Sequence, residues 1–217
     1  MRFANIFSTI LAVILVTGSA AAHHPLNGMP METFVHGLLS GIGHPLLGFD
    51  HLFFVISAGI VAVFTAARVV SLAAYLVAMV AGCLLMYIGT ALPLTELIIA
   101  ASLIVVGGLL VISFGMQNSI VIGLFLLFGL FHGSAFGGSI ATAESTASIT
   151  VLSGYLLGLI AIQFLIGWLA GGLTKTLSKA SSNIPTMGAR LTGAAVAGVG
   201  GFLILEILEG PLVQALI

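Results

Sequence analysis

The sequence has very few charged residues for its length, and this scarcity excludes most classes of soluble protein. Its 217 residues include 5 Lys and Arg and 6 Asp and Glu, so that 5% are charged while 60% are hydrophobic. In ordinary soluble domains about a quarter of residues are charged. A net charge of −1 leaves no basic face for binding nucleic acid. With a mean hydropathy of +1.31, the composition predicts an all-α membrane protein of one domain.

Cysteine and the common catalytic motifs are also scarce. Cys83 is the single cysteine, so an internal disulfide is excluded, and its place inside an apolar run favours a packing role. The sequence contains no H-E-x-x-H and no Ser-His or Cys-His pair at a catalytic spacing. The residues around Lys175 lack the spacing of a P-loop. We therefore expect neither an enzyme nor an ATPase, and no tightly bound cofactor.

Glycine and long apolar runs are abundant instead. A membrane-spanning helix needs about 20 apolar residues, and breakers separate six segments of roughly that length. The segments lie at approximately 46–67, 70–91, 95–115, 119–138, 148–173 and 189–208. They predict six transmembrane helices within residues 44–217. Small residues spaced by four permit close helix contacts, and we expect such contacts at Gly129-x3-Gly133, Gly154-x3-Gly158 and Gly167-x3-Gly171.

The N-terminal residues 1–22 have the three parts of a secretory signal peptide. Arg2 is followed by an apolar run, and Ala20 and Ala22 suit the cleavage site. Cleavage would make His23 the new N-terminus, and the alternative is an uncleaved anchor. Residues 23–43 are mixed in character, and we expect an exposed periplasmic tail followed by a short interfacial helix.

Basic residues predict the orientation of the chain. If the mature N-terminus is periplasmic, the first, third and fifth connections face the cytoplasm. All basic residues beyond Arg2 then lie on that side, as the positive-inside rule requires: Arg68, Lys175, Lys179 and Arg190. We therefore predict a multi-pass protein of the bacterial inner membrane. Carboxylates gather on or near the outer side, where they would concentrate divalent cations.

Two polar motifs interrupt the apolar runs, and their depths agree. The stretch from His44 to His51 heads the first span, and His132 lies in the fourth. An ionisable group at membrane depth costs about 2.5–3.5 kcal/mol on insertion scales and by default indicates function. At 1.5 Å per residue, Asp50 and His51 lie about 9–10 Å inside the outer surface, and His132 lies about 9 Å below it. We predict that these side chains converge in the outer half of the bilayer.

The residue types at this level are those of a transition-metal site. Imidazole suits zinc, copper and nickel, whereas a carboxylate shifts the preference toward harder ions. The predicted ligands are His44, Asp50, His51 and His132. In a continuous helix that begins near His44, with Pro45 in its first turn, His44 and His51 would share a face. Asp50 points about 100° away from His51, so it either binds metal or orients a histidine.

Several other side chains are possible ligands. Glu144 lies in an outer connection, His36 lies before the first span, and His23 and His24 could chelate with a free N-terminal amine. Gln163, midway along the fifth span, has two open interpretations. It makes a hydrogen bond between helices, or it belongs to an ion pathway.

The two motifs resemble those of the HupE/UreJ family of hydrogenase and urease accessory membrane proteins. His44-Pro45-Leu46-Leu47-Gly48-Phe49-Asp50-His51 matches H-P-x-x-G-x-D-H, and Phe131-His132-Gly133-Ser134-Ala135 matches F-H-G-x-A. Ala143-Glu144 and Ile162-Gln163 resemble stretches of cyanobacterial-type members. The resemblance implies nickel uptake, or cobalt uptake in some members, through the four predicted ligands. Family members often continue the second motif with His or Tyr and an acid, where this chain has Phe136 and Gly138.

Two functions follow as expectations. The first is a secondary permease or facilitator for Ni²⁺, with Co²⁺ next, which imports the ion for metalloenzyme or cofactor assembly. Its partners would be the lipid bilayer, the divalent ion and cytoplasmic metallochaperones. The alternative is a metal-binding accessory protein of hydrogenase or urease maturation that transports nothing. A copper role stays open because Met29 and Met31 lie near the N-terminal histidines.

Overall fold

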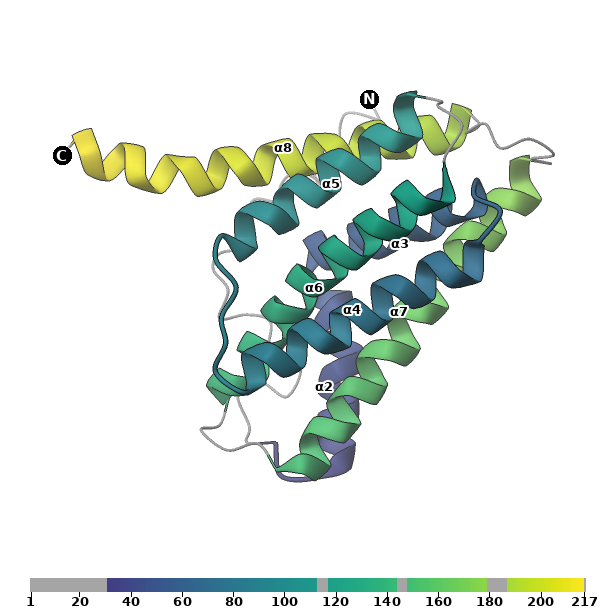
Figure 1. Ribbon diagram of the computed structural model, residues 1–217. Helices are drawn as coiled ribbons and strands as arrows, with labels where there is room; N and C mark the ends of the chain where they lie inside the picture. Colours follow the sequence, from purple (N-terminus) through teal and green to yellow (C-terminus); the bar gives the residue numbers. More distant parts are fainter. Residues whose placement is uncertain (1–30, 113–116, 144–147, 179–186, 217) are drawn as a thin grey trace, which may run out of the picture.

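The computed structural model describes residues 31–112, 117–143, 148–178 and 187–216, and every regular element in these ranges is a helix (Figure 1). The helices are α2 (Phe34–Leu47), α3 (Phe49–Val63), α4 (Arg68–Tyr87), α5 (Thr95–Ile112), α6 (Asn118–Ala143), α7 (Ile149–Ser178) and α8 (Met187–Leu216). The all-α prediction is confirmed for this part of the chain. The predicted signal peptide, His23, His24, Met29 and Glu144 lie outside the described residues.

The helices α4 to α8 are each long and apolar enough to cross a membrane, which makes the chain a multi-pass membrane protein. The helices α2 and α3 pass the same test only as a pair, bent by 82° at Gly48. Alone, α3 has 15 residues and is about 22 Å long, short of the roughly 30 Å of a hydrocarbon core. Within the described residues, the predicted count of six holds only if this bent pair forms one crossing.

The first predicted span, 46–67, is not one helix, which corrects the prediction of a continuous helix from His44. The short helix expected before residue 44 is present but continues to Leu47. Gly48 then interrupts the helix with extended backbone, and α3 begins at Phe49. Pro45 therefore lies in the last turn of α2 and not in a first turn. A proline near a helix end followed closely by glycine is a stop signal, which the earlier interpretation missed.

Glycine faces bring the helices together in close pairs. The pairs α4 with α6, α2 with α7 and α5 with α8 have extensive contacts, and α4 and α6 lie side by side in Figure 1. A Cβ atom added at Gly133 would overlap the carbonyl oxygen of Met79 on α4. Gly154 and Gly158 approach α2 in the same way, and Gly171 approaches α3. The predicted small-residue contacts are thus confirmed.

The short helix α3 is the centre of the bundle. It contacts each of the other described helices, α2 and α4 to α8, and it lies among them in Figure 1. Most of its residues are buried, including His51 in its first turn. Phe49 at the start of this turn is about half exposed, but the His51 side chain points into the bundle, where side chains from several helices can reach it.

The glycine contacts give a test of this packing. We expect Gly133→Ala to lower the free energy of unfolding by about 1–3 kcal/mol, because the added methyl group must push α4 and α6 apart. Gly123→Ala is the matched control in the same helix, since a Cβ there meets no atom within 4 Å. Thermal unfolding in detergent measures both. Equal melting temperatures for the two variants would contradict the close α4–α6 contact.

Candidate metal-binding site

Two imidazoles meet in the interior of the bundle. His51 comes from the first turn of α3 and His132 from α6, and their Nδ1 atoms are 2.8 Å apart. His51 is 5% exposed and His132 is fully buried. Asp50 precedes His51 in the same turn. The predicted convergence of these side chains is therefore confirmed, while their depth in the outer half of the bilayer and their role as ligands stay predictions.

Aromatic rings enclose the two histidines. The Phe136 ring centroid is 4.4 Å from that of His51, and the Phe54 centroid is 4.3 Å from that of His132. Phe136 follows His132 by one turn of α6, so both project toward α3. This apolar surrounding lowers the local dielectric and strengthens each polar contact within it.

Ser102 of α5 fixes the orientation of His132. Its hydroxyl donates to the Ile99 carbonyl at 2.6 Å, and the same oxygen lies 3.1 Å from Nε2 of His132. Because a hydroxyl has one hydrogen, Nε2 of His132 must donate to Ser102. Nδ1 of His132 then has a lone pair and accepts a hydrogen bond from the Nδ1–H of His51. A single proton therefore joins the two Nδ1 atoms.

Asp50 lies at the other nitrogen of His51. Its Oδ2 is 3.9 Å from Nε2 of His51, within ion-pairing distance but longer than a hydrogen bond. Nε2 and Nδ1 point to different sides of an imidazole ring, so Asp50 and His132 contact His51 from opposite sides. This arrangement favours an orienting role for Asp50 over direct coordination beside His132.

The bend at Gly48 brings His44 toward His51. Their ring centroids are 5.9 Å apart, whereas seven residues along one straight helix would separate them by about 10.5 Å. Tyr155 of α7 lies beside His44, with its hydroxyl 3.4 Å from Nδ1, and donates to the Phe136 carbonyl at 3.0 Å. The predicted proximity of the two histidines is present, but it arises from a broken helix and not from a shared face.

His36 is not brought to this cluster. It lies in the first turn of α2, where its Nδ1 accepts a hydrogen bond from the Glu32 N–H at 3.3 Å. Eight residues separate it from His44, about 12 Å along the helix. In the part of the chain that the structure describes, no three or more His, Cys, Asp or Glu residues are arranged to hold a metal ion as they stand.

Sequence reasoning missed the residues that surround the histidines. Ser102, Phe54 and Tyr155 belong to no motif, and each lies in a different helix. The only available signal was a hydroxyl within the apolar run of α5, which is common in membrane helices. Phe136 was noted only as a departure from the family pattern.

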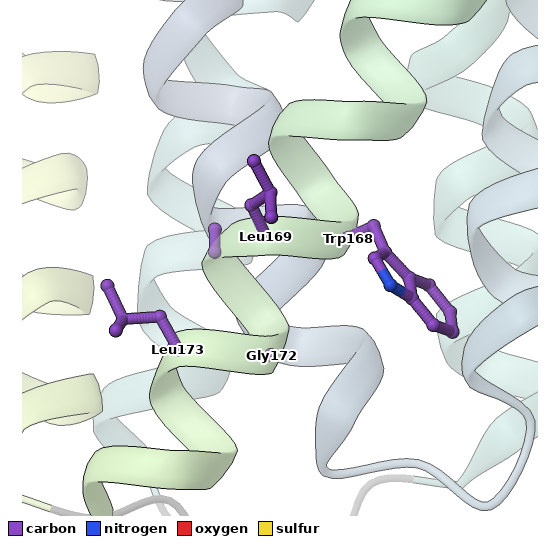
Figure 2. Close-up of a pocket in the computed structure, with 5 residues that line it drawn as sticks. Trp168, Leu169, Gly172 and Leu173 are labelled. Atoms are coloured by element: carbon purple, nitrogen blue, oxygen red, sulfur yellow. The ribbon is translucent and has the colours of Figure 1, made fainter.

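The hollow shown in Figure 2 is a different feature of the molecule. It has a volume of about 420 Å³ and lies on α7, lined by Trp168, Leu169, Ala170, Gly172 and Leu173. Leu169 and Leu173 are largely exposed, on the side of α7 away from the glycines that pack against α3. Its apolar lining offers no ligand for a metal ion, and lipid can fill it.

Comparison with known proteins agrees with the motifs. The family model described as HupE / UreJ protein matches residues 11–203. The chain is 27% identical over 208 residues to Protein HupE of Rhizobium leguminosarum bv. viciae, covering 94% of this chain and 100% of that protein. No solved structure matches the chain.

Gly48 gives a test of the site geometry. A Cβ atom there would lie 2.8 Å from Cδ2 of His51 and 3.3 Å from Oδ1 of Asp50, while its φ of −81° suits any residue. We expect Gly48→Ala to displace the His51 ring and to weaken nickel binding by about tenfold, the usual scale for disturbed supporting contacts.

Calorimetric titration of the purified protein measures this effect. The control is Gly108→Ala in α5, where a Cβ meets nothing within 4 Å. Wild-type nickel affinity in Gly48→Ala would show that the position of His51 does not determine binding.

Proposed function

The chain belongs to the HupE/UreJ family, and on that premise we propose that it carries a divalent transition-metal ion across the bacterial inner membrane toward the cytoplasm. Ni²⁺ is the first expected ion and Co²⁺ the next. The observation that carries the proposal is the buried pair His51 and His132, with Nδ1 atoms 2.8 Å apart inside an apolar bundle. Burying two ionisable groups inside a membrane protein is costly, so such a pair by default indicates function.

The separation of the two Nδ1 atoms is close to that of two adjacent ligands on one ion. Metal–nitrogen distances are about 2.0–2.1 Å, so two adjacent nitrogens on one ion lie about 2.8–3.4 Å apart in octahedral or tetrahedral geometry. The observed separation is 2.8 Å. The nitrogens are therefore close to the required separation, but the rings must turn so that both Nδ1 lone pairs point at the ion, and the shared proton must leave Nδ1 of His51.

The neighbouring groups have supporting roles in this proposal. When the ion binds, the proton of His51 moves from Nδ1 to Nε2, on the side of the Asp50 carboxylate, which leaves the Nδ1 lone pair for the ion. Ser102 keeps the proton of His132 on Nε2 by accepting its hydrogen. His44, in the last turn of α2, has its ring centroid 5.9 Å from that of His51, so it is the imidazole from which an ion would pass to the pair.

The described basic residues support the proposed orientation. Arg68 begins α4 and Lys175 lies in the last turn of α7. The Arg68 guanidinium donates to the backbone carbonyl of Trp168 on α7 and lies 3.8 Å from the centroid of the Trp168 ring. The start of α4 therefore lies beside the C-terminal part of α7, so Arg68 and Lys175 are at one end of the bundle. We assign this end to the cytoplasm by the positive-inside rule. Metallochaperones would receive the ion there.

A second function has one observation in its favour. His132 is fully buried and its pair is enclosed by aromatic rings, as suits a protein that holds an ion without releasing it. Purified protein in liposomes separates the two functions. Nickel that binds the protein and never reaches the lumen would establish the accessory role.

The ligand assignment is tested by uptake of radiolabelled nickel in cells. We expect His132→Ala and Asp50→Ala each to lower the initial rate by at least about tenfold, because the first removes a ligand and the second removes the group that orients His51. His36→Ala is the control, since His36 is remote from the pair. Unchanged uptake in both test variants, at equal protein levels, would refute the assignment.

The choice of metal is tested by competition. We expect unlabelled Ni²⁺ to suppress nickel uptake at the lowest concentration and Co²⁺ at the next. We expect Zn²⁺ and Cu²⁺ to suppress uptake only at higher concentrations, although simple affinity favours copper at almost any nitrogen site. The expected order therefore requires selection by geometry. Suppression by Cu²⁺ at the lowest concentration would reverse the assignment of the ion.

A further inference from the structure

Three helices place buried polar atoms without hydrogen-bond partners in one region of the bundle. The atoms are Nε2 of Gln163, Oγ of Ser57 and Oγ of Ser71. Gln163 is 1% exposed, and both serines are fully buried. An unsatisfied buried group costs about 1–3 kcal/mol, and lipid supplies no water that could satisfy it. Three such groups from α3, α4 and α7 indicate a binding site whose ligand or water supplies the missing hydrogen-bond partners.

The register of the helices puts these atoms next to the histidine pair. The Tyr75 hydroxyl donates to Oε1 of Gln163, and the Tyr75 ring centroid is 6.2 Å from that of His132. It is also 5.2 Å from the ring centroid of Phe54. Tyr75 therefore connects Gln163 to the enclosure around the histidines.

The serines lie one turn further along. Ser57 follows Phe54 by three residues on α3, and Ser71 precedes Tyr75 by four on α4. Residues at these spacings share a helix face, and α3 and α4 run in opposite directions. Both hydroxyls are thus displaced about 5 Å from the Phe54–Tyr75 contact in the same direction. That direction is toward Arg68, at the end assigned to the cytoplasm.

We propose that Gln163, Tyr75, Ser57 and Ser71 form an inner polar station that receives the ion from the histidine pair and releases it inward. This inference rests on the proposed transport function. The station offers the hydroxyl oxygens of Ser57 and Ser71 to the ion and the NH₂ group of Gln163 to its hydration water, and such oxygens bind nickel or cobalt more weakly than imidazole does. Conduction requires that the ion can leave, and a second site with lower affinity for the ion makes this possible. The histidines select the ion, and the station lets it depart.

A structural hydrogen bond alone does not account for Gln163. Its Oε1 is satisfied by Tyr75, but its NH₂ group remains buried without a partner. A water molecule, free or in the hydration shell of a passing ion, can accept a hydrogen bond from that NH₂ group. The hydroxyls of Ser57 and Ser71 face the same water or ion. The sequence left two interpretations of Gln163 open, and each applies to one end of its amide. The oxygen makes the hydrogen bond between helices, and the NH₂ group faces the ion pathway.

The test is a double variant, Tyr75→Phe with Gln163→Leu, reconstituted in liposomes. Removing both partners of a hydrogen bond leaves neither unsatisfied, so we expect no loss of thermal stability. We expect unchanged nickel bound per protein and a luminal nickel flux lowered by about tenfold or more. Gln117→Leu is the control, because Gln117 is exposed at the start of α6.

A second variant keeps the test independent of folding. Ser57→Ala with Ser71→Ala removes two hydroxyls that make no hydrogen bond, and we expect it to lower flux while binding persists. Its control is Ser153→Ala, which removes an exposed hydroxyl of α7.

The outcomes separate the two proposals. Wild-type flux in both double variants would overturn the inner station and leave transport intact. Loss of nickel binding together with flux would also overturn it, because these residues would then support the histidine site. Absence of luminal nickel with the wild-type protein would overturn transport itself, and the station with it.

Discussion

The hydrogen bond between His51 and His132 constrains how the helices of this membrane protein can lie. Lipid offers no hydrogen-bond partner, so each buried imidazole must find one inside the protein. The bond ties the first turn of α3 to the middle of α6 at one depth. Glycine faces hold α6 against α4, and α3 contacts each of the other described helices. The close packing and the polar centre therefore depend on the same arrangement.

The meeting of His51 and His132 was predicted from the nearly constant rise of a helix, although the helix counted from His44 is broken at Gly48. Counting residues from the ends of two apolar runs placed Asp50, His51 and His132 at one level without any knowledge of packing. The runs that became α4 to α8 were visible for the same reason. The break at Gly48 was not recognised, because glycine occurs throughout these helices and Pro45 also suits a first turn.

The residues that surround the histidines could not be predicted from the sequence. Ser102, Phe54 and Tyr155 act through neighbours on other helices, and no local pattern reveals which helices are adjacent. Gln163 was noticed as a polar residue in an apolar run, but the unequal satisfaction of its two ends is visible only in three dimensions. Local patterns thus indicated which residues matter, while tertiary contacts determined how each is oriented.

The bend between α2 and α3 has an electrostatic consequence for any cation that reaches the site. Because the chain turns at Gly48, α3 begins at Phe49, and the partial positive charge of its N-terminus lies beside the buried ring of His51. This helix end repels an approaching cation. The carboxylate of Asp50, in that same first turn, offsets the repulsion without having to touch the ion. A neutral side chain at this position would leave a barrier at the mouth of an otherwise intact binding site.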